Sequence, residues 1–255
     1  MFAKNNRGQV TLFIIIGLLV LFSVTTYLLF QNENTVTLTS DDLITNLEFT
    51  EVTQHIQYCL QTVSEDAVVI NGLKGGLYNP EKFVFGFLRP PITTYYKKGN
   101  LTAPFQENVA YSIGLEFLDL MPACLDEFNG TQETLEYDQD YAEVTVRIVE
   151  QDVVFAVDYP ITSSKAERST TFSRFTHTVE NVRLSTILDL ATELSYLQQT
   201  DPGFICVSCV VELADQNFMY IDFTDIGDNK TVYTFTDLFS SINDEPYVFM
   251  MAHEH

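Results

Sequence analysis

A run of 22 residues without a charged side chain constrains this chain more than any other feature. It covers residues 9–30, QVTLFIIIGLLVLFSVTTYLLF, near the start of the 255-residue sequence. A helix of this length would span about 33 Å, and the hydrocarbon core of a membrane is about 30 Å thick. The run exceeds the apolar region of a secretory signal peptide, and no small-residue cleavage site follows it. We therefore expect residues 9–30 to form a transmembrane helix that remains attached as an anchor.

The charges on either side of this run predict its orientation. Lys4 and Arg7 precede it, and only acidic residues follow it closely. Because basic residues favour the cytoplasmic side of a membrane, we expect residues 1–8 to form a cytoplasmic leader. Residues 31–40 are then a polar linker, and residues 41–255 an extracytoplasmic domain. The sequence thus predicts a single-pass protein of the cell membrane with its C-terminal domain outside the cell.

The net charge limits the classes of partner. The chain has 13 basic and 35 acidic residues, and 11 of the basic ones lie beyond residue 30, so that this outer part carries a charge of −24. Binding to DNA or RNA requires cations that displace phosphate counterions, so no nucleic-acid partner is expected. Attraction to anionic lipid headgroups is excluded by the same sign of charge. The acidic excess is typical of a solvated, exported surface.

Four cysteines fit an exported domain, because disulfides form in oxidising compartments. They are Cys59, Cys124, Cys206 and Cys209, and they allow three pairings. We favour structural disulfides that join Cys59 to Cys124 and Cys206 to Cys209. A metal shared by the four thiolates is one alternative, and redox chemistry at the C-x-x-C of Cys206 and Cys209 is the other.

Three N-x-[ST] sequons also lie beyond the apolar run and predict glycosylation at Asn100, Asn129 and Asn229. Chance occurrence in a threonine-rich chain is the alternative interpretation. Both interpretations place these asparagines in polar turns. The sequons therefore support an exported surface without specifying an activity.

Motifs for catalysis are absent from the sequence. It has no H-E-x-x-H, no G-x-S-x-G and no Walker motif. His55 and His177 are expected to be structural or solvated, and His253 and His255 to lie in a frayed terminus. We therefore predict that the protein is not an enzyme and has no catalytic residue, resident metal or cofactor.

Hydrophobic periodicity predicts an α+β domain of three to four helices and an antiparallel sheet of five to six strands behind the transmembrane helix. Pro160 is expected to end the second strand of a hairpin, and Tyr95, Tyr96 and the two lysines after them to form a solvated turn. The expected helices cover about residues 41–65, 105–128, 182–199 and 206–214. The expected strands of the sheet lie near 142–148, 153–159, 170–179, 218–226, 231–237 and 246–252, and a separate short strand is expected near 83–87.

The junction Arg7-Gly8-Gln9, followed by Val10-Thr11-Leu12-Phe13, resembles the class III signal peptide of archaeal type IV pilins. The resemblance implies that a prepilin peptidase cuts between Gly8 and Gln9 and leaves the hydrophobic helix attached. It also implies that the protein partners with itself or with other pilin-like subunits. Pilins usually have Glu at the fifth mature position, where this chain has Phe13. This departure favours a minor, tip or unassembled role over the main filament.

The rest of the chain resembles an uncharacterised family of single-span archaeal surface proteins. The segments that carry this second resemblance are IQYCLQTVSEDAVVINGLKGGLY, MPACL and ICVSCVVELA. This second resemblance supports the architecture and the placement of the cysteines but implies no activity. The Arg7-Gly8-Gln9 junction and the order of helix and antiparallel sheet predict a pilin-like, membrane-anchored structural or adhesion protein of the cell surface. A monomeric anchored binding module of the envelope is the first alternative, and an extracytoplasmic thiol–disulfide redox protein is the second.

Overall fold

The computed structural model describes residues 49–80, 91–130, 133–202 and 205–255. The predicted leader, anchor and linker lie outside these residues, as does the predicted strand near residues 83–87. Within the described ranges no helix is both long and apolar enough to cross a membrane. The structure therefore does not support the transmembrane helix that the predicted fold included.

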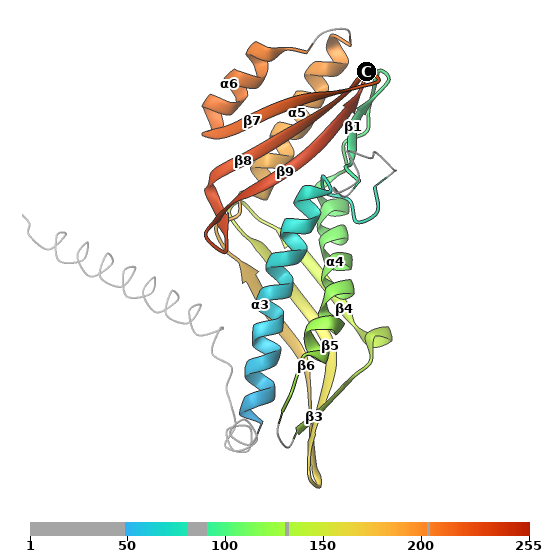
Figure 1. Cartoon of the computed structure of the whole chain (residues 1–255), viewed down its shortest axis with the longest axis vertical. Helices are drawn as coiled ribbons and strands as arrows, with labels where there is room; N and C mark the ends of the chain where they lie inside the picture. The colour runs from blue at the N-terminus through green and yellow to red at the C-terminus, as the bar shows by residue number, and fades with distance from the viewer. Residues whose placement is uncertain (1–48, 81–90, 131–132, 203–204) are drawn as a thin grey trace, which may run out of the picture. The chain divides into compact units, whose positions relative to one another are not determined.

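Four α-helices and nine strands make up the described part of the chain, which confirms the α+β class (Figure 1). The helices are α3 (Thr50–Leu73), α4 (Gln106–Asp126), α5 (Leu184–Thr200) and α6 (Val207–Asn217), and a short 3-10 helix covers Gln139–Tyr141. The strands are β1 (Thr94–Lys97), β2 (Asn100–Leu101), β3 (Glu133–Tyr137), β4 (Glu143–Ile148), β5 (Val153–Lys165), β6 (Arg168–Val179), β7 (Met219–Gly227), β8 (Lys230–Ile242) and β9 (Glu245–Glu254).

The strands form two sheets, so the prediction of a single antiparallel sheet is wrong. One sheet has the order β2-β1-β9-β8-β7, and the other has β3 and β4 along one edge of β5 with β6 along its opposite edge. Strand β1 runs parallel to β9. This pairing joins segments about 150 residues apart, and no local pattern in the sequence specifies it.

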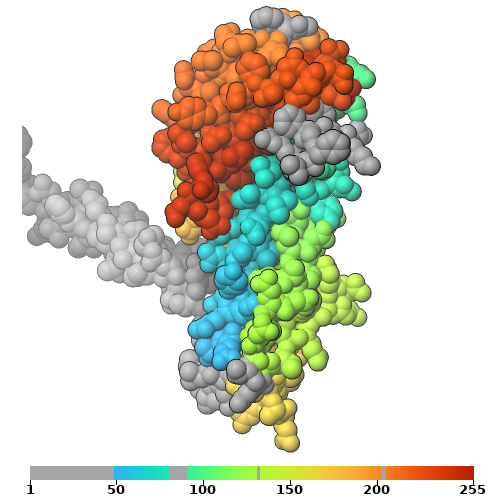
Figure 2. Space-filling view, in the orientation of Figure 1, coloured from blue at the N-terminus to red at the C-terminus, as the bar shows by residue number. Residues whose placement is uncertain are grey.

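Helix α3 connects the two sheets, because it packs against β9 of one and against β6 and β5 of the other. Helices α3 and α4 lie side by side (Figures 1 and 2), and α4 rests on β4. The apolar positions of α3 recur every three or four residues and face one continuous core. They are Val52, Ile56, Cys59, Leu60, Val63, Ala67 and Val68. Burial of this stripe explains why the segment is helical.

Two glycines let the end of α3 approach β9 closely. A Cβ atom on Gly72 would lie 2.5 Å from the hydroxyl of Tyr247 and 2.8 Å from the carbonyl oxygen of Val248. Gly75 has a φ of +76°, and a Cβ there would lie 2.5 Å from the carbonyl oxygen of Met250. Only glycine adopts the positive φ of Gly75 readily and leaves room for the nearby backbone of β9. These glycines therefore let the end of α3 pack closely on the sheet.

Three local predictions require correction. The first predicted helix continues past residue 65 to Leu73, because Ala67 and Val68 extend its buried stripe. Pro160 lies inside β5, at a shift of register between Asp158 and Ile161, where the missing N–H of proline breaks no ladder bond. Tyr95 and Tyr96 do not form a solvated turn: they belong to β1 and are almost completely buried.

Candidate functional site

The two disulfides have the pairing that the sequence favoured, Cys59 with Cys124 and Cys206 with Cys209. The four cysteines therefore do not form one centre, and a metal held by all four thiolates is not supported. The first disulfide joins α3 to α4 across 65 residues of sequence, with a Cα–Cα distance of 5.7 Å and Cys59 fully buried. The second closes a stretch of three residues at the start of α6.

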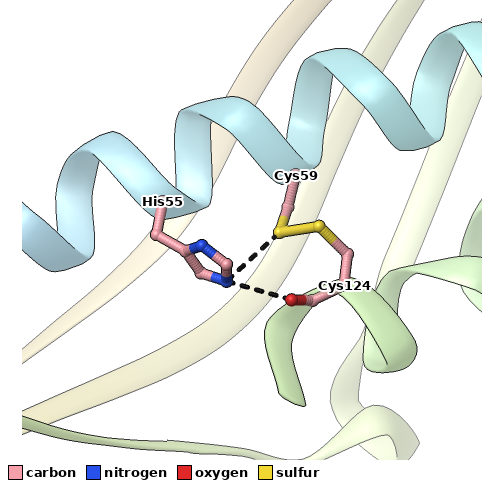
Figure 3. Close-up of side chains that lie close together, drawn as sticks. All are labelled: His55, Cys59 and Cys124. Carbon is pink, nitrogen blue, oxygen red and sulfur yellow. Dashed lines mark hydrogen bonds between the residues drawn. A yellow bond between two sulfur atoms is a disulfide. The ribbon is translucent and has the colours of Figure 1, made fainter. Parts of the chain in front are cut away.

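His55 lies directly beside the first disulfide (Figure 3). Its Nε2 is 2.9 Å from the carbonyl oxygen of Cys124 and 3.5 Å from the Sγ of Cys59. Because a carbonyl oxygen only accepts, Nε2 carries the proton and donates it to that bond. The imidazole also packs on the ring of Phe128, with 5.2 Å between centroids. The predicted structural role of His55 thus fits its contacts.

The ligand atoms of His55, Cys59 and Cys124 all lie within 4.8 Å of one another, which is close enough for a metal centre. Metals bind thiolates and deprotonated imidazole nitrogens. Here both sulfurs are used in the disulfide, and the facing imidazole nitrogen donates to a carbonyl group. In this oxidised state the cluster therefore offers no thiolate, and its chemistry is that of a covalent crosslink.

His253 lies in β9 and is completely buried, so the prediction of a frayed terminus is wrong. Its Nε2 lies 2.8 Å from the Oγ of Ser195 on α5, and its Nδ1 has no hydrogen-bond partner within the part of the chain that the structure describes. The hydroxyl of Ser195 also lies 2.7 Å from the carbonyl oxygen of Ala191, to which it donates. The serine proton therefore points away from the imidazole. The pair lacks both access and an activated hydroxyl, and it serves as a buried structural contact.

Burial, reinforced by the nearby imidazole of His255, lowers the pKa of His253 to about 3. The unfolded residue has a pKa near 6.5, so the unfolded state binds the proton first as the pH falls. We therefore expect the free energy of unfolding to decrease by up to about 1.4 kcal/mol per pH unit between pH 6.5 and 3. Urea unfolding at pH 7, 6 and 5 measures this slope.

A His253→Gln variant tests the assignment, because glutamine retains an amide for Ser195 but does not titrate. It should show a flatter pH dependence than the wild type over this range. The rings of Tyr96 and Tyr233 pack on His253. An unchanged slope in the variant would assign the acid sensitivity to other groups.

Exposed aromatic and aliphatic side chains surround two adjacent hollows, and we call this region the aromatic surface. It comprises Leu101, Phe105, Tyr111, Val149 and Tyr196. Soluble proteins rarely leave such a group of large apolar side chains in contact with water unless it binds something. Gln106 lines both hollows and donates from Nε2 to the carbonyl oxygen of Ile148 at 2.9 Å, which fixes the first turn of α4 against β4.

The larger hollow, of about 600 Å³, lies between the segment that enters α4 and the helix α5. Phe105 and Tyr196 are 77% and 58% exposed and line it together with Asp189 and Glu193. Asp189, Glu193 and Tyr196 follow one another at helical spacing, so α5 presents them on one face. We call this hollow the acidic hollow. Among the described residues that line it, this hollow combines two aromatic rings with two carboxylates and no basic side chain.

The smaller hollow, of about 450 Å³, lies between α4 and β4. Its walls include Tyr111, which is 69% exposed, and the alternate β4 residues Val144, Val146 and Ile148. Arg147 and Glu107 lie at its edge, so this hollow carries both signs of charge. The aromatic surface thus has one strongly acidic half and one mixed half.

Sequence reasoning did not find the aromatic surface, because three distant segments build it. One signal was present: Tyr111 and Tyr196 lie opposite the buried stripes of α4 and α5. A single exposed aromatic residue is common on protein surfaces, whereas several gathered in one patch indicate a binding surface.

The structure also places the remaining predicted residues. The sequon asparagines Asn100, Asn129 and Asn229 are all exposed, so each is sterically accessible; their glycosylation stays a prediction. The processing site Gly8-Gln9 lies outside the described residues. Comparison with models of protein families, with curated proteins and with solved structures finds no match to this chain.

Proposed function

We propose that this chain is a pilin-like adhesion protein of the cell surface that binds a positively charged protein segment in the acidic hollow. The observation that carries the proposal is the exposure of Phe105 and Tyr196 beside Asp189 and Glu193. An exported binding protein needs a surface of this kind, and a structural subunit without a ligand does not.

The chemistry of the acidic hollow selects lysine and arginine side chains. Cations are attracted to the faces of aromatic rings, and carboxylates form charge-assisted hydrogen bonds with ammonium and guanidinium groups. The charge of −24 on the outer part of the chain adds a long-range attraction for cations. A basic segment with extended side chains therefore matches both the local and the global charge.

The cell-surface part of the proposal rests on three supports. The Arg7-Gly8-Gln9 junction resembles a class III signal peptide, the domain has two disulfides, and its sequons are exposed. Disulfides of this kind persist in oxidising surroundings outside the cytoplasm. We therefore place the domain on the outer side of the cell membrane.

The same charge favours a minor, tip or unassembled role. Copies that each carry −24 repel one another when they are packed closely, unless salt screens the repulsion. The presence of Phe13, at the position where pilins usually have Glu, also favours a minor, tip or unassembled role. Self-association of purified protein at physiological salt would favour a filament subunit, whereas a stable monomer agrees with the adhesion role.

Binding of a lysine- and arginine-rich peptide to purified full-length protein tests the proposed site. Phe105→Ser combined with Tyr196→Ser should weaken binding at least about tenfold, or about 1.4 kcal/mol, because the cation then loses both ring faces. Asp189→Asn combined with Glu193→Gln should have an effect of similar size. Fluorescence anisotropy with a labelled peptide gives the dissociation constants.

Matched controls separate this site from general attraction to an acidic protein. Tyr141→Ser removes an aromatic side chain of similar exposure from the 3-10 helix, and Glu212→Gln with Asp215→Asn removes two carboxylates from α6. Both controls should bind the peptide as the wild type does. Equal losses in control and site variants would mean that net charge alone attracts the peptide, and would refute a specific site.

Mass spectrometry of protein from native membranes tests the pilin-like part separately. Processing by a prepilin peptidase predicts a mature chain that starts at Gln9. An intact Met1 would remove this part of the proposal and leave an exported binding protein of another kind.

A further inference from the structure

The two disulfides differ in what they contribute to the fold. Cys59–Cys124 is buried at its α3 end and closes 65 residues, whereas Cys206–Cys209 closes three residues and is partly exposed at both ends. A crosslink constrains the unfolded chain more strongly as the closed loop lengthens. The first disulfide is therefore expected to stabilise the fold. The second restricts the unfolded chain little, and its position favours a role in thiol–disulfide exchange.

The surroundings of Cys206 favour a negatively charged sulfur. Cys206 is the N-cap residue of the 11-residue helix α6, and the backbone N–H of Cys209 is directed at its Sγ at 3.3 Å. The hydroxyl of Ser208 lies 3.5 Å from the same sulfur. Backbone N–H groups and the dipole at a helix N-terminus stabilise a thiolate. After reduction of the disulfide, Cys206 is thus the better nucleophile and the better leaving group of the pair.

An exposed apolar strip adjoins this disulfide. Val207, between the two cysteines, is 49% exposed, and Val211, one turn further along α6, is 55% exposed. The inner face of the helix is held by Val210 and Leu213, which are buried. The outer strip is thus available for contact with an extended apolar segment that brings its thiol to the cysteines.

We propose that Cys206–Cys209 is a thiol–disulfide exchange site for reduced, unfolded polypeptides outside the cell. A substrate thiolate attacks the Sγ of Cys209, the S–S bond breaks, and Cys206 leaves as the thiolate that the helix N-terminus stabilises. A second substrate thiolate then attacks the substrate sulfur of the mixed disulfide and releases Cys209. The substrate gains a disulfide, the pair becomes a dithiol by accepting two electrons, and the two substrate protons are released or taken up by the pair.

Repeated turnover needs an oxidant, which we identify as a small-molecule disulfide. Cys206 attacks this disulfide, forms a mixed disulfide and releases one small thiol. Cys209 then attacks the Sγ of Cys206, which reforms the Cys206–Cys209 bond and releases the second small thiol. This activity uses α6 alone and does not depend on the acidic hollow. The adhesion proposal and the exchange proposal can therefore fail independently.

Partial reduction of the folded full-length protein is the first test. The protein is equilibrated with mixtures of reduced and oxidised glutathione, free thiols are blocked with N-ethylmaleimide, and each cysteine is read by peptide mass spectrometry. Cys206–Cys209 should be half reduced at a ratio of reduced to oxidised glutathione at least about tenfold lower than Cys59–Cys124, which serves as the internal control. Reduction of both disulfides at the same ratio would overturn the proposal.

Single-cysteine variants test the assigned roles. In Cys209→Ser the free Cys206 should form a mixed disulfide with oxidised glutathione at least about tenfold faster than Cys209 does in Cys206→Ser. The wild type with oxidised glutathione should also oxidise a reduced apolar peptide that contains two cysteines faster than oxidised glutathione alone, and Cys206→Ser with Cys209→Ser should give only the rate of oxidised glutathione alone. Equal rates for the two single variants, or no acceleration of peptide oxidation by the wild type, would leave a purely structural disulfide.

Discussion

Replacing Cys59 and Cys124 together by alanine is expected to lower the free energy of unfolding by about 2–5 kcal/mol. The crosslink joins buried Cys59 of α3 to the last turn of α4 and closes 65 residues, which gives it a large effect on the unfolded chain. It also fixes His55 against Phe128 and the end of α4. Urea unfolding followed by circular dichroism, with matched slopes for both proteins, measures the loss.

The second disulfide supplies the control for this prediction. Cys206→Ala with Cys209→Ala opens a loop of only three residues, so it should lower the free energy of unfolding by about 2 kcal/mol or less. An equal or larger loss from the second pair would mean that loop length does not govern these two crosslinks. It would also remove the contrast on which the exchange proposal depends.

Asp237→Ala is expected to lower the free energy of unfolding by about 3–5 kcal/mol, because it leaves the Arg183 guanidinium without its carboxylate partner. The carboxylate is fully buried and accepts from Arg183 Nε at 2.9 Å and Nη2 at 2.5 Å, from Ser240 and from the backbone N–H of Phe239. Arg183 also donates to the carbonyl oxygen of Asn217. This cluster joins the start of α5, the end of α6 and the irregular part of β8.

The protonation of Asp237 gives the same cluster a pH signature. Burial raises the pKa of this carboxyl, but the hydrogen bonds from Arg183, Ser240 and the Phe239 backbone outweigh it and hold the pKa below the ordinary value. The stabilisation is therefore present above about pH 4 and is lost as the pH falls below that. Asp237→Asn should show a smaller loss of stability between pH 4 and pH 3 than the wild type.

A paired replacement keeps the Asp237 prediction testable. Arg183→Met with Asp237→Leu removes both charges and should recover a substantial part of the loss, because no buried charge then remains unpaired. If the double variant is no more stable than Asp237→Ala, the stability lost in Asp237→Ala comes from packing and not from an unpaired guanidinium group.

Elements with local signals could be predicted from the sequence. The β4–β5 hairpin follows strict alternation from Val144 to Val157, and α4 follows one stripe from Val109 to Leu125, so each is encoded within its own segment. The partition into two sheets was not encoded locally. It depends on pairings between distant segments, such as β1 with β9, and the buried side chains of Tyr95 and Tyr96 lie in that paired strand.

The candidate sites follow the same division. The cysteine pairing was predicted because few pairings exist. The acidic hollow escaped prediction because Phe105 and Asp189 are far apart in sequence, and 35 carboxylates offer no way to single out two. His253 was misjudged because a position near the end of the printed sequence suggested fraying, whereas long-range pairing with β8 and β1 buries it.

The placement of the first disulfide determines how the domain carries a mechanical load. If the domain is held from the start of α3 and a ligand binds in the acidic hollow as proposed, the two pulling points are Thr50 and Phe105, at the starts of α3 and α4. Tension between them would unwind the first turns of α3, up to Cys59, before it reaches a covalent crosslink. Beyond that residue the load passes through Cys124 into α4 instead of through the packed interface. Adhesion under flow would therefore extend only a short part of the chain before the covalent link resists further stretching.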